Sequence, residues 1–317
     1  MYLAFQRVLR EIVLILLFFL PRERKKRVER WLRGREDALK LARADYVIAS
    51  YGKSGRTWLR VMLSRFFQVR YGIAQRHLIG FDNLHRKNAA IPRIFFTHDN
   101  YLGDFTGNRD SKADYAGKKV LLLVRHPADI VVSQYFQWKF RMRPVKKFIN
   151  DYPAHGEDVA IFDFVMREAS GLPKIIDYLN LWAREASKVG ALHLVRYEDM
   201  RARPQEVLRG IVEFMGSPGD AEQIAEAVDF ASVENMRALE QKKVFWLSGS
   251  RMVAKDRSNP QSYKVRRAKV GGYRDYFDDA QVARIEALVN ERLDPTFGYG
   301  AGPDAATASP GESAAGD

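Results

Sequence analysis

The sequence predicts an α/β fold, a single domain in which helices flank a central, mostly parallel sheet. Four short apolar runs alternate with segments of helical periodicity along the 317-residue chain. Continuous apolar runs are typical of parallel strands that helices bury on both faces. The first run leads directly into Gly-Lys-Ser-Gly and then a helix, which is a P-loop-like strand-loop-helix unit. A hydrophobic content of 46% is enough to form a sizeable core.

The predicted strands are the four apolar runs. The helix after the first of them begins near Thr57, and Gly72 can close it. No internal repeat or interior linker interrupts the pattern, so we expect one domain over residues 45–299 and a disordered, Pro/Gly-rich tail over residues 300–317. The four strands are expected at residues 45–50 (DYVIAS), 93–98 (RIFFTH), 119–125 (KVLLLVR) and 191–197 (ALHLVRY).

The net charge of +13 calls for an anionic partner. It is concentrated in two blocks, residues 1–44 and residues 242–274. No recognition helix, zinc finger or RNA-stacking motif accompanies them, so nucleic acid is not favoured as the partner. The chain has no cysteine, which fits a reducing, cytoplasmic compartment and provides no thiolate for a metal site.

The basic N-terminal segment, residues 1–44, contains an apolar run that is too short to cross a bilayer. The run from Ile12 to Leu20 is less than half of the roughly 20 residues that a span needs. Lys and Arg follow it at residues 22–27, where a signal peptide would have small residues. Two interpretations stay open. Residues 1–35 lie peripherally on an anionic membrane, at its cytoplasmic face, or they form an amphipathic helix packed on the domain.

The stretch YGKSGRTW, residues 51–58, predicts a cradle for an anion. Its glycines let backbone amides converge, the helix N-terminus adds partial positive charge, and Lys53 adds a full charge. A P-loop kinase or nucleotide hydrolase is the first alternative. Its first glycine would stand at Val47, and the strand-end Asp that holds magnesium is replaced where VLLLV runs into Arg125. The sequence therefore favours a shorter cradle, backed by arginine and without a metal.

Four motifs, in order, resemble those of the sulfotransferases that use 3′-phosphoadenosine 5′-phosphosulfate (PAPS), most nearly the cytosolic type. The stretch YGKSGRTW is similar to the family's Y-P-K-S-G-T-T-W, and RHPADIVVS, with Arg125 and Ser133, is similar to R-N-P-x-D followed by Ser. The family's YEDM begins at Tyr197, and RRAKVGGY from Arg266 is similar to R-K-G-x-x-G-D-W. The resemblance covers roughly residues 45–277.

This resemblance implies an enzyme that moves a sulfuryl group from PAPS to an acceptor hydroxyl without a metal. Lys53 would stabilise the bridging oxygen of the leaving group, and His98 would take the proton from the acceptor as general base. The loop would hold the 5′-phosphosulfate, Arg125 and Ser133 with the second basic block the 3′-phosphate, and Trp58 and Tyr197 the adenine. The cofactor-binding residues implied are Lys53, Ser54, Gly55, Arg56, Thr57, Trp58, Arg125, Ser133, Tyr197, Arg266, Arg267 and Ala268.

Four of the departures from the family pattern bear on the site. Gly52 replaces a Pro, which loosens the loop, and Arg56 replaces a Thr, so that it either adds a charge-assisted contact or points to solvent. Phe96 replaces the Lys before Thr-His, which removes one cation, and Ala268 replaces a Gly beside the 3′-phosphate. The stretch RDYFDDAQVA lacks the family's dimerisation pattern, so no dimer is expected.

The acceptor is expected to be a small molecule, a glycan or a glycolipid. Residues 77–110 and 136–170 would border its pocket, and they combine aromatic with charged side chains. Such a mixture suits a phenol or sterol as well as a sugar. The N-terminal segment favours a lipid-linked or envelope saccharide. A non-catalytic adaptor that binds acidic membranes is a further alternative, but it would leave the four motifs unexplained.

Overall fold

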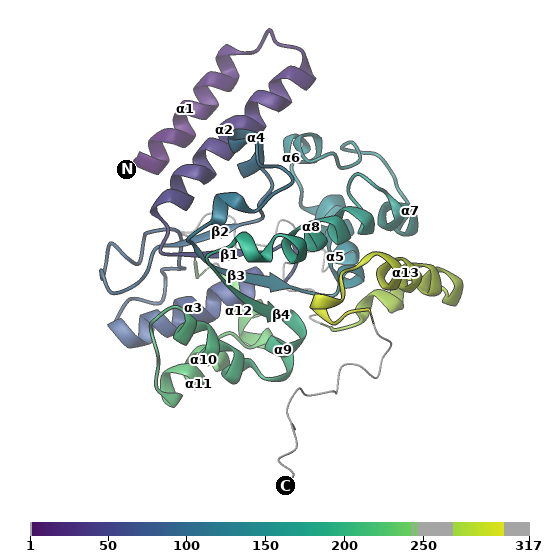
Figure 1. Ribbon diagram of the computed structural model, residues 1–317. Coiled ribbons are helices and arrows are strands. Elements are labelled where there is room, and N and C mark those ends of the chain that lie inside the picture. The colour runs from purple at the N-terminus through teal and green to yellow at the C-terminus, as the bar shows by residue number, and fades with distance from the viewer. Residues whose placement is uncertain (1, 243, 246–268, 301–317) are drawn as a thin grey trace.

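The computed structural model describes residues 2–242, 244–245 and 269–300, and side chains of the first helix from residue 8 onward together with Gln6. Its centre is a four-stranded sheet with strand order β2-β1-β3-β4 (Figure 1). All pairings are parallel, and Val47 lies opposite Phe95 on one side and Val120 on the other. The predicted parallel sheet is therefore confirmed. The strands are β1 (Tyr46–Ala49), β2 (Ile94–Thr97), β3 (Lys119–Val124) and β4 (Ala191–Arg196).

Helices cover both faces of the sheet, as the continuous apolar runs predict. Alternate residues of β1 and β3 point to opposite faces because side chains alternate along a strand. Val47 and Val120 belong to a core shared with α5, α8 and α13, whereas Ile48 and Leu121 belong to a core shared with α3, α10 and α11. The bounds are α3 (Arg56–Tyr71), α5 (Pro127–Phe140), α8 (Leu172–Arg184), α10 (Pro204–Phe214), α11 (Ala221–Phe230) and α13 (Asp279–Arg292).

The fourth strand differs from its prediction as a buried strand. β4 is last in the strand order, so one of its edges has no neighbouring strand, and most of its residues are only half-buried. Leu194 is among the exposed large hydrophobic residues. The smaller helices are α4 (Leu102–Thr106), α6 (Pro144–Ile149), α7 (Ile161–Met166), α9 (Tyr197–Ala202) and α12 (Val233–Lys242), with 3₁₀ turns at Ala113–Tyr115, Ala186–Lys188, Gly272–Tyr276 and Pro295–Phe297.

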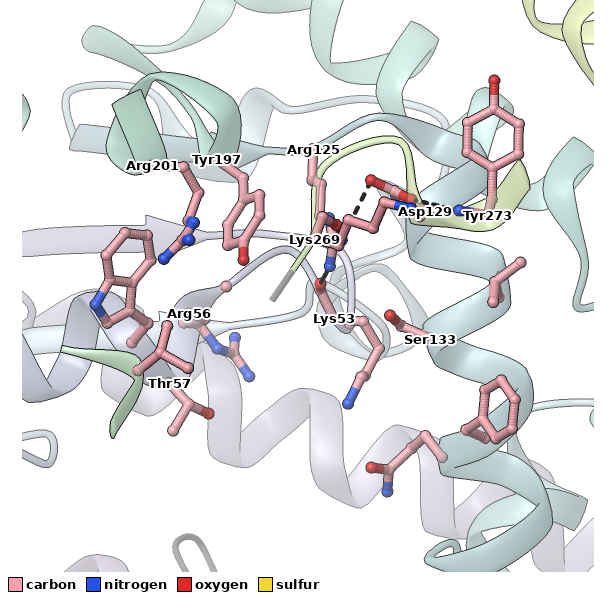
Figure 2. A pocket seen from close by; sticks show the side chains of 18 of the residues that line it. Lys53, Arg56, Thr57, Arg125, Asp129, Ser133, Tyr197, Arg201, Lys269 and Tyr273 are labelled. Carbon is pink, nitrogen blue, oxygen red and sulfur yellow. Dashed lines mark hydrogen bonds and ion pairs between the residues drawn. The ribbon is translucent and has the colours of Figure 1, made fainter. Parts of the chain in front are cut away.

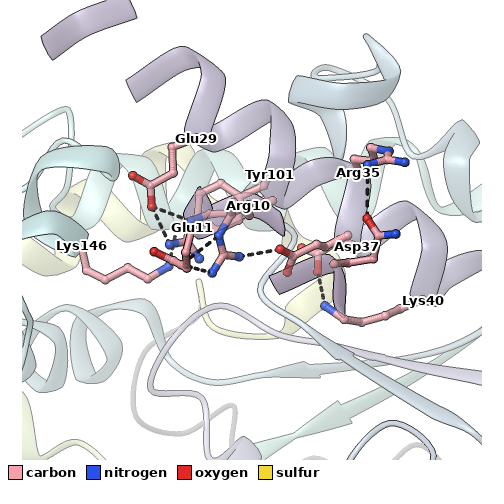
Figure 3. Close-up of polar contacts among 11 residues, drawn as sticks. Arg10, Glu11, Glu29, Arg35, Asp37, Lys40, Tyr101 and Lys146 are labelled. Carbon is pink, nitrogen blue, oxygen red and sulfur yellow. Dashed lines mark hydrogen bonds and ion pairs between the residues drawn. The ribbon is translucent and has the colours of Figure 1, made fainter. Parts of the chain in front are cut away.

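The N-terminal segment forms a helical hairpin of α1 (Tyr2–Leu16) and α2 (Arg22–Arg43) that projects from one side of the domain (Figure 1). Arg10 of α1 bonds Glu36 of α2 at 2.7 Å, as part of the polar cluster in Figure 3. Arg30 of α2 forms an ion pair with Asp104 of α4 at 2.9 Å. The second helix is thus packed on the domain, as one of the two interpretations requires.

The first helix and the turn after it expose a run of apolar side chains. They recur at helical spacing, and Phe18 and Phe19 are 81% and 70% exposed. Arg22 and Arg24 at the start of α2 are also exposed. No helix among the described residues has the length and apolar content to cross a membrane. The exposed apolar residues are Val8, Ile12, Ile15, Leu16, Phe18 and Phe19.

Candidate functional site

The carboxyl ends of the four strands meet at one cavity, which is where parallel α/β sheets bind ligands. Lys53, His98, Arg125 and Tyr197 follow β1, β2, β3 and β4 respectively, and all four line a cavity of about 270 Å³ (Figure 2). Of the other predicted site residues, Gly55, Arg56, Thr57, Trp58 and Ser133 also line it. Ser54 lies buried in the loop behind it.

The loop between β1 and α3 takes a backbone conformation that suits an anion cradle. Lys53 and Gly55 both have positive φ, 78° and 94°, and α3 begins at Arg56. A Cβ on Gly55 would lie 2.6 Å from Cδ2 of Tyr197, so only glycine fits there without a shift of the ring. The buried hydroxyl of Ser54 has no hydrogen-bond partner among the described residues. The first amides of α3 also lack partners within their helix. The loop can therefore hold a phosphate or sulfate oxygen.

Arg125 is fixed by contacts on three sides. Its Nη2 donates to the carbonyl of Lys269 at 3.0 Å and lies 3.2 Å from the Asp129 carboxylate. Its guanidinium carbon lies 4.4 Å from the centre of the Tyr197 ring. Its Nε is buried without a hydrogen-bond partner among the described residues. A fixed guanidinium with a remaining donor suits a bound phosphate.

Asp129 organises this side of the cavity, a role that was not predicted from the sequence. Its carboxylate accepts hydrogen bonds from the amide of Gly271 at 2.9 Å and from the amide of Tyr273 at 3.0 Å, the latter visible in Figure 2. It thereby connects the end of the second basic block, at Gly271 and Tyr273, to Arg125, which lies between β3 and α5. The signal was present in the sequence, because Asp129 is the Asp of the R-x-P-x-D motif.

The hydrogen bonds of His98 define its tautomer. Its Nδ1 donates to the carbonyl of Ser50 at 2.9 Å, and its Nε2 contacts Nη2 of Arg56. Since a carbonyl only accepts and a guanidinium only donates, the imidazole is neutral with its lone pair on Nε2. Arg56 therefore makes a contact within the site rather than pointing to solvent, which selects one of the two expectations for this position.

Two aromatic rings, those of Trp58 and Tyr197, also line the cavity. Trp58 donates from Nε1 to the carbonyl of Ala231 at 2.8 Å, and its ring lies 5.9 Å from that of Tyr197. The guanidinium carbon of Arg201 lies 5.6 Å from the Trp58 ring and also lines the cavity, although no motif singled it out. A planar base could stack or make an edge contact here.

The other expectations concern residues 266–268 and the departures from the family pattern at Gly52 and Phe96. Arg266, Arg267 and Ala268 lie outside the described residues, and Lys269 is the first residue after them that lines the cavity. A Cβ at Gly52 would approach Oε1 of Gln134 to 3.2 Å, so the loop is closely covered at that position. The guanidinium carbon of Arg60 lies 3.7 Å from the centre of the Phe96 ring.

A second cavity, of about 340 Å³, adjoins the first. Gly52, His98 and Gln137 line both. Of the expected ranges 77–110 and 136–170, the aromatic and charged side chains that line it include Tyr101, Lys146 and Tyr152, whereas Asp37 and Lys174 come from outside these ranges. Its lining consists of Asp37, Tyr51, Gly52, Thr97, His98, Asn100, Tyr101, Gln134, Gln137, Met142, Lys146, Asn150, Tyr152 and Lys174.

The expected acceptor ranges mix core and surface residues. Phe95 and Trp138 are buried in the core, Phe105 packs against Trp31, and Phe136 and Arg141 line the first cavity instead. The other residues considered there are Phe81, Asp82, Asp99, Asp104, Lys139, Phe140 and Arg143. Aromatic content alone does not separate a ligand pocket from a core, because both bury large rings.

His126 makes stability depend on pH in the acidic range. Its ring stacks parallel to that of Tyr273, and burial, helped by Arg274 and Arg125 and opposed by Asp129 and Glu286, lowers its pKa to about 4. The unfolded chain takes up this proton near pH 6.5, whereas the folded chain takes it up only near pH 4. Stability is therefore lost as pH falls through this window, by about 2 kcal/mol at pH 5.

We expect His126→Asn to remove this contribution. In melting curves at pH 7.5 and pH 5, the variant should lose less stability on acidification than the wild type. His155→Asn, on an exposed loop, serves as the control. Equal acid losses for the wild type and His126→Asn would contradict the assignment.

No group of three or more His, Cys, Asp or Glu side chains within residues 2–242 and 269–300 is arranged to hold a metal ion. The charges in the first cavity are mainly cationic, from Lys53, Arg56, Arg125, Arg201 and Lys269. The cavity therefore suits an anionic ligand.

Comparison with known proteins gives one family. A family model described as a sulfotransferase domain matches residues 43–297. Flavonol 3-sulfotransferase of Flaveria bidentis is 24% identical over 293 residues, with 84% of this chain and 88% of that protein covered. Cytosolic sulfotransferase 17 of Arabidopsis thaliana is 26% identical, with 80% and 75% covered.

Solved structures share the fold. The structure of mouse sulfotransferase SULT7A1 complexed with PAP (3′-phosphoadenosine 5′-phosphate) has a TM-score of 0.52 and 19% identity, and covers 81% of this chain and 89% of its own. Retinol dehydratase in a complex with retinol and PAP has a TM-score of 0.53 and 16% identity, and covers 83% and 86%.

Proposed function

The chain belongs to the sulfotransferase domain family, and we propose that it transfers the sulfuryl group of PAPS to a hydroxyl of a saccharide or glycolipid. PAPS supplies an activated sulfuryl group on a leaving phosphate. The observation that carries the proposal is the convergence of Lys53, His98 and Arg125 on one cationic cavity at the carboxyl edge of the sheet. A second cavity beside His98 gives the acceptor a place to lie.

The first cavity has groups for both ends of the donor. The loop at residues 52–57 would hold the phosphosulfate, with Ser54 as an available hydroxyl. Arg125 and Ser133 would hold the 3′-phosphate, together with residues 266–268 of the second basic block. Trp58 and Tyr197 would contact the adenine. The buried, unpartnered donors of Ser54 and Arg125 support this fit, because a buried polar group without a partner costs free energy that a bound anion would offset.

His98 and Lys53 would act on the two sides of the transferred group. The lone pair of His98 Nε2 accepts the proton of the acceptor hydroxyl as its oxygen bonds to sulfur. Lys53 stabilises the negative charge on the oxygen that leaves with PAP. The guanidinium of Arg56 has to move away from Nε2 of His98 before this proton transfer. The anionic sulfuryl group is a suitable new partner for that guanidinium. This machinery consists of cationic and neutral side chains and requires no metal.

A thermal-shift experiment tests the donor. PAP at about a hundred times its dissociation constant should stabilise the protein by roughly 2.7 kcal/mol in the presence of EDTA. Arg125→Ala should reduce this stabilisation sharply, whereas Arg86→Ala, which removes an exposed arginine, should not. Stabilisation by ATP with magnesium but not by PAP would instead indicate a P-loop kinase or nucleotide hydrolase.

We further propose that the hairpin tip docks on an anionic membrane surface. Phe18 and Phe19 are the most exposed apolar side chains of the described chain, and the basic residues Arg22 and Arg24 follow at once. Apolar side chains that enter the interface beside cations that meet acidic headgroups are the combination that holds amphipathic helices on membranes. This would bring a lipid-linked acceptor near the enzyme.

Sedimentation with vesicles tests this docking. The double variant Phe18→Ser, Phe19→Ser should bind vesicles containing phosphatidylserine at least tenfold more weakly than the wild type, because each buried Phe contributes roughly 1.5–3 kcal/mol. Val145→Ser, at an exposed apolar position on α6, is the matched control and should bind normally. Binding that is unchanged in the double variant would remove the proposed docking.

A further inference from the structure

The second cavity is lined mostly by residues that carry a polar side-chain group. Among its described lining residues, Gly52 and Met142 alone lack a polar side-chain group. Small-molecule pockets are mostly apolar with a few polar groups that fix orientation. Several of these groups are bonded to one another, as Lys146 is to Tyr101, and an acceptor with hydroxyl groups can form further hydrogen bonds with them. The lining therefore favours an acceptor with many hydrogen-bonding groups.

Two lysines, Lys146 and Lys174, line this cavity. Asn150 takes part in the hydrogen bonds around both of them. The amino group of Lys146 donates to the hydroxyl of Tyr101 at 3.2 Å, and that hydroxyl donates to Oδ1 of Asn150 at 3.0 Å. The amino group of Lys174 lies 3.5 Å from the main-chain carbonyl of the same Asn150. The two ammonium groups thus come from α6 and α8 and face one polar cluster (Lys146 and Tyr101 are in Figure 3).

Neither ammonium group forms an ion pair with a carboxylate within the described part of the chain, whose ion pairs join other residues. Asp37 also lines the cavity, but its carboxylate bonds Lys40 at 3.0 Å. Burial lowers the pKa of Lys146 to about 8 and also lowers the pKa of Lys174. Partly buried cations without a carboxylate partner are prepared to bind an anion.

We propose that the second cavity binds the acceptor and that Lys146 and Lys174 bind a carboxylate or phosphate that the acceptor carries beside its reacting hydroxyl. The inference rests on the proposed function, because it takes His98, which lines both cavities, as the point where acceptor and donor meet. It narrows the acceptor class to acidic saccharides and similar acidic polyols. The volume of about 340 Å³ lies at the lower end of the range for small-molecule sites and fits a compact acceptor unit.

Calorimetric titration of the full-length protein, saturated with PAP, tests the subsite without requiring turnover. The probes are 4-nitrophenyl β-glucuronide, its neutral glucoside counterpart, and glucose 6-phosphate. The wild type should bind at least one of the two anionic probes ten- to a hundredfold more tightly than the glucoside, as expected for charge-assisted contacts. Which anionic probe binds more tightly separates a carboxylate from a phosphate. Equal or tighter binding of the glucoside, or no binding of either anion, would overturn the proposal.

Variants separate the lysines from the rest of the cavity. Lys146→Met and Lys174→Met should each weaken the anionic probe about tenfold or more and leave the glucoside unchanged. Lys87→Met, at an exposed position, should change neither. The PAP-induced thermal shift should persist in both lysine variants. If PAP produces no thermal shift in the wild type, the proposed function is refuted. If PAP produces the shift but the wild type does not prefer the anionic probes, this inference alone is refuted.

The pH dependence gives an independent readout. Lys146 is faced by Arg10 and Glu11 from α1, by Glu29, Arg33 and Asp37 from α2, and by Tyr101. Because its pKa is about 8, affinity for the anionic probe should fall as pH rises from 7 to 9. Lys146→Arg keeps its charge throughout and should flatten this profile. A profile that is identical in wild type and Lys146→Arg would contradict the role of this residue.

Discussion

Replacement of His98 by asparagine should lower kcat for sulfuryl transfer by about two to four orders of magnitude, the usual contribution of a general base. The proposed mechanism needs the Nε2 lone pair, which the bond from Nδ1 to the Ser50 carbonyl leaves available in the neutral ring. An asparagine side chain is not basic enough to take the proton of a hydroxyl. The loss should therefore appear in kcat, measured as PAP formation with saturating acceptor.

Binding of the donor separates this role from a structural one. His98→Asn should keep the PAP-induced thermal shift, because the residues proposed to hold the nucleotide are intact. The matched control is His85→Asn, which removes another half-buried imidazole that bonds a main-chain carbonyl, that of Ile91 at 2.8 Å. It should leave kcat nearly unchanged. A kcat within threefold of the wild type for His98→Asn would mean that another group, or water, takes the proton.

Replacement of Asp129 by alanine should destabilise the protein by about 3–5 kcal/mol, the range for breaking a buried ion pair on one side. Asp129 is 3% exposed, and its loss leaves Arg125 without its carboxylate and the amides of Gly271 and Tyr273 without acceptors. Such a loss is a large part of the stability of an ordinary domain. Urea unfolding followed by circular dichroism measures it.

Two further variants locate the effect. Asp129→Asn retains one acceptor oxygen but not the charge, so it should be less destabilising than alanine and should still weaken PAP binding. Asp82→Ala removes a carboxylate that pairs with exposed Arg86 at 3.3 Å, and it should cost no more than about 1 kcal/mol. If Asp129→Ala unfolds at the same urea concentration as Asp82→Ala, the bonds from Asp129 to Arg125, Gly271 and Tyr273 do not contribute to stability.

The sheet was predictable because its signal is local. The runs of the two inner strands, β1 and β3, are largely apolar, and a strand buried on both faces requires that pattern. The positions of Lys53, His98, Arg125 and Tyr197 at one cavity followed from the rule that parallel strands share a carboxyl edge. The edge position of β4 was not predictable in this way, since its run has the same apolar character as the inner strands.

The rest of the site depends on contacts between segments distant in sequence. Asp129 bonds residues more than 140 positions away, and Lys174 reaches the second cavity from a helix that no motif marks. The side chain of Arg56 had two open directions, and only the placement of His98 on a neighbouring strand decides between them. Local pattern carries no information on such pairings, because they are set by how the helices pack on the sheet.

The N-terminal hairpin shows the same limit. An amphipathic segment with one apolar stripe has the same sequence whether the stripe meets a protein core or a lipid surface. Here α2 is attached to the domain through Arg30 and Asp104, while the apolar side chains around Phe18 remain exposed. Packing on the domain thus accounts for α2, whereas membrane contact of the exposed apolar residues stays a proposal.

The bond between Asp129 and the Gly271 segment has a consequence for how the protein matures during synthesis. All four strands, the cradle loop and His98 precede α12, so a nascent chain that has emerged to this point already contains the whole sheet. Arg125 and Asp129 then still await Lys269, Gly271 and Tyr273. Domains begin to fold while the ribosome is still adding residues. The wall of the cavity formed by Arg125, Asp129 and Lys269 is therefore completed only after the sheet, the cradle loop and His98 have been synthesised.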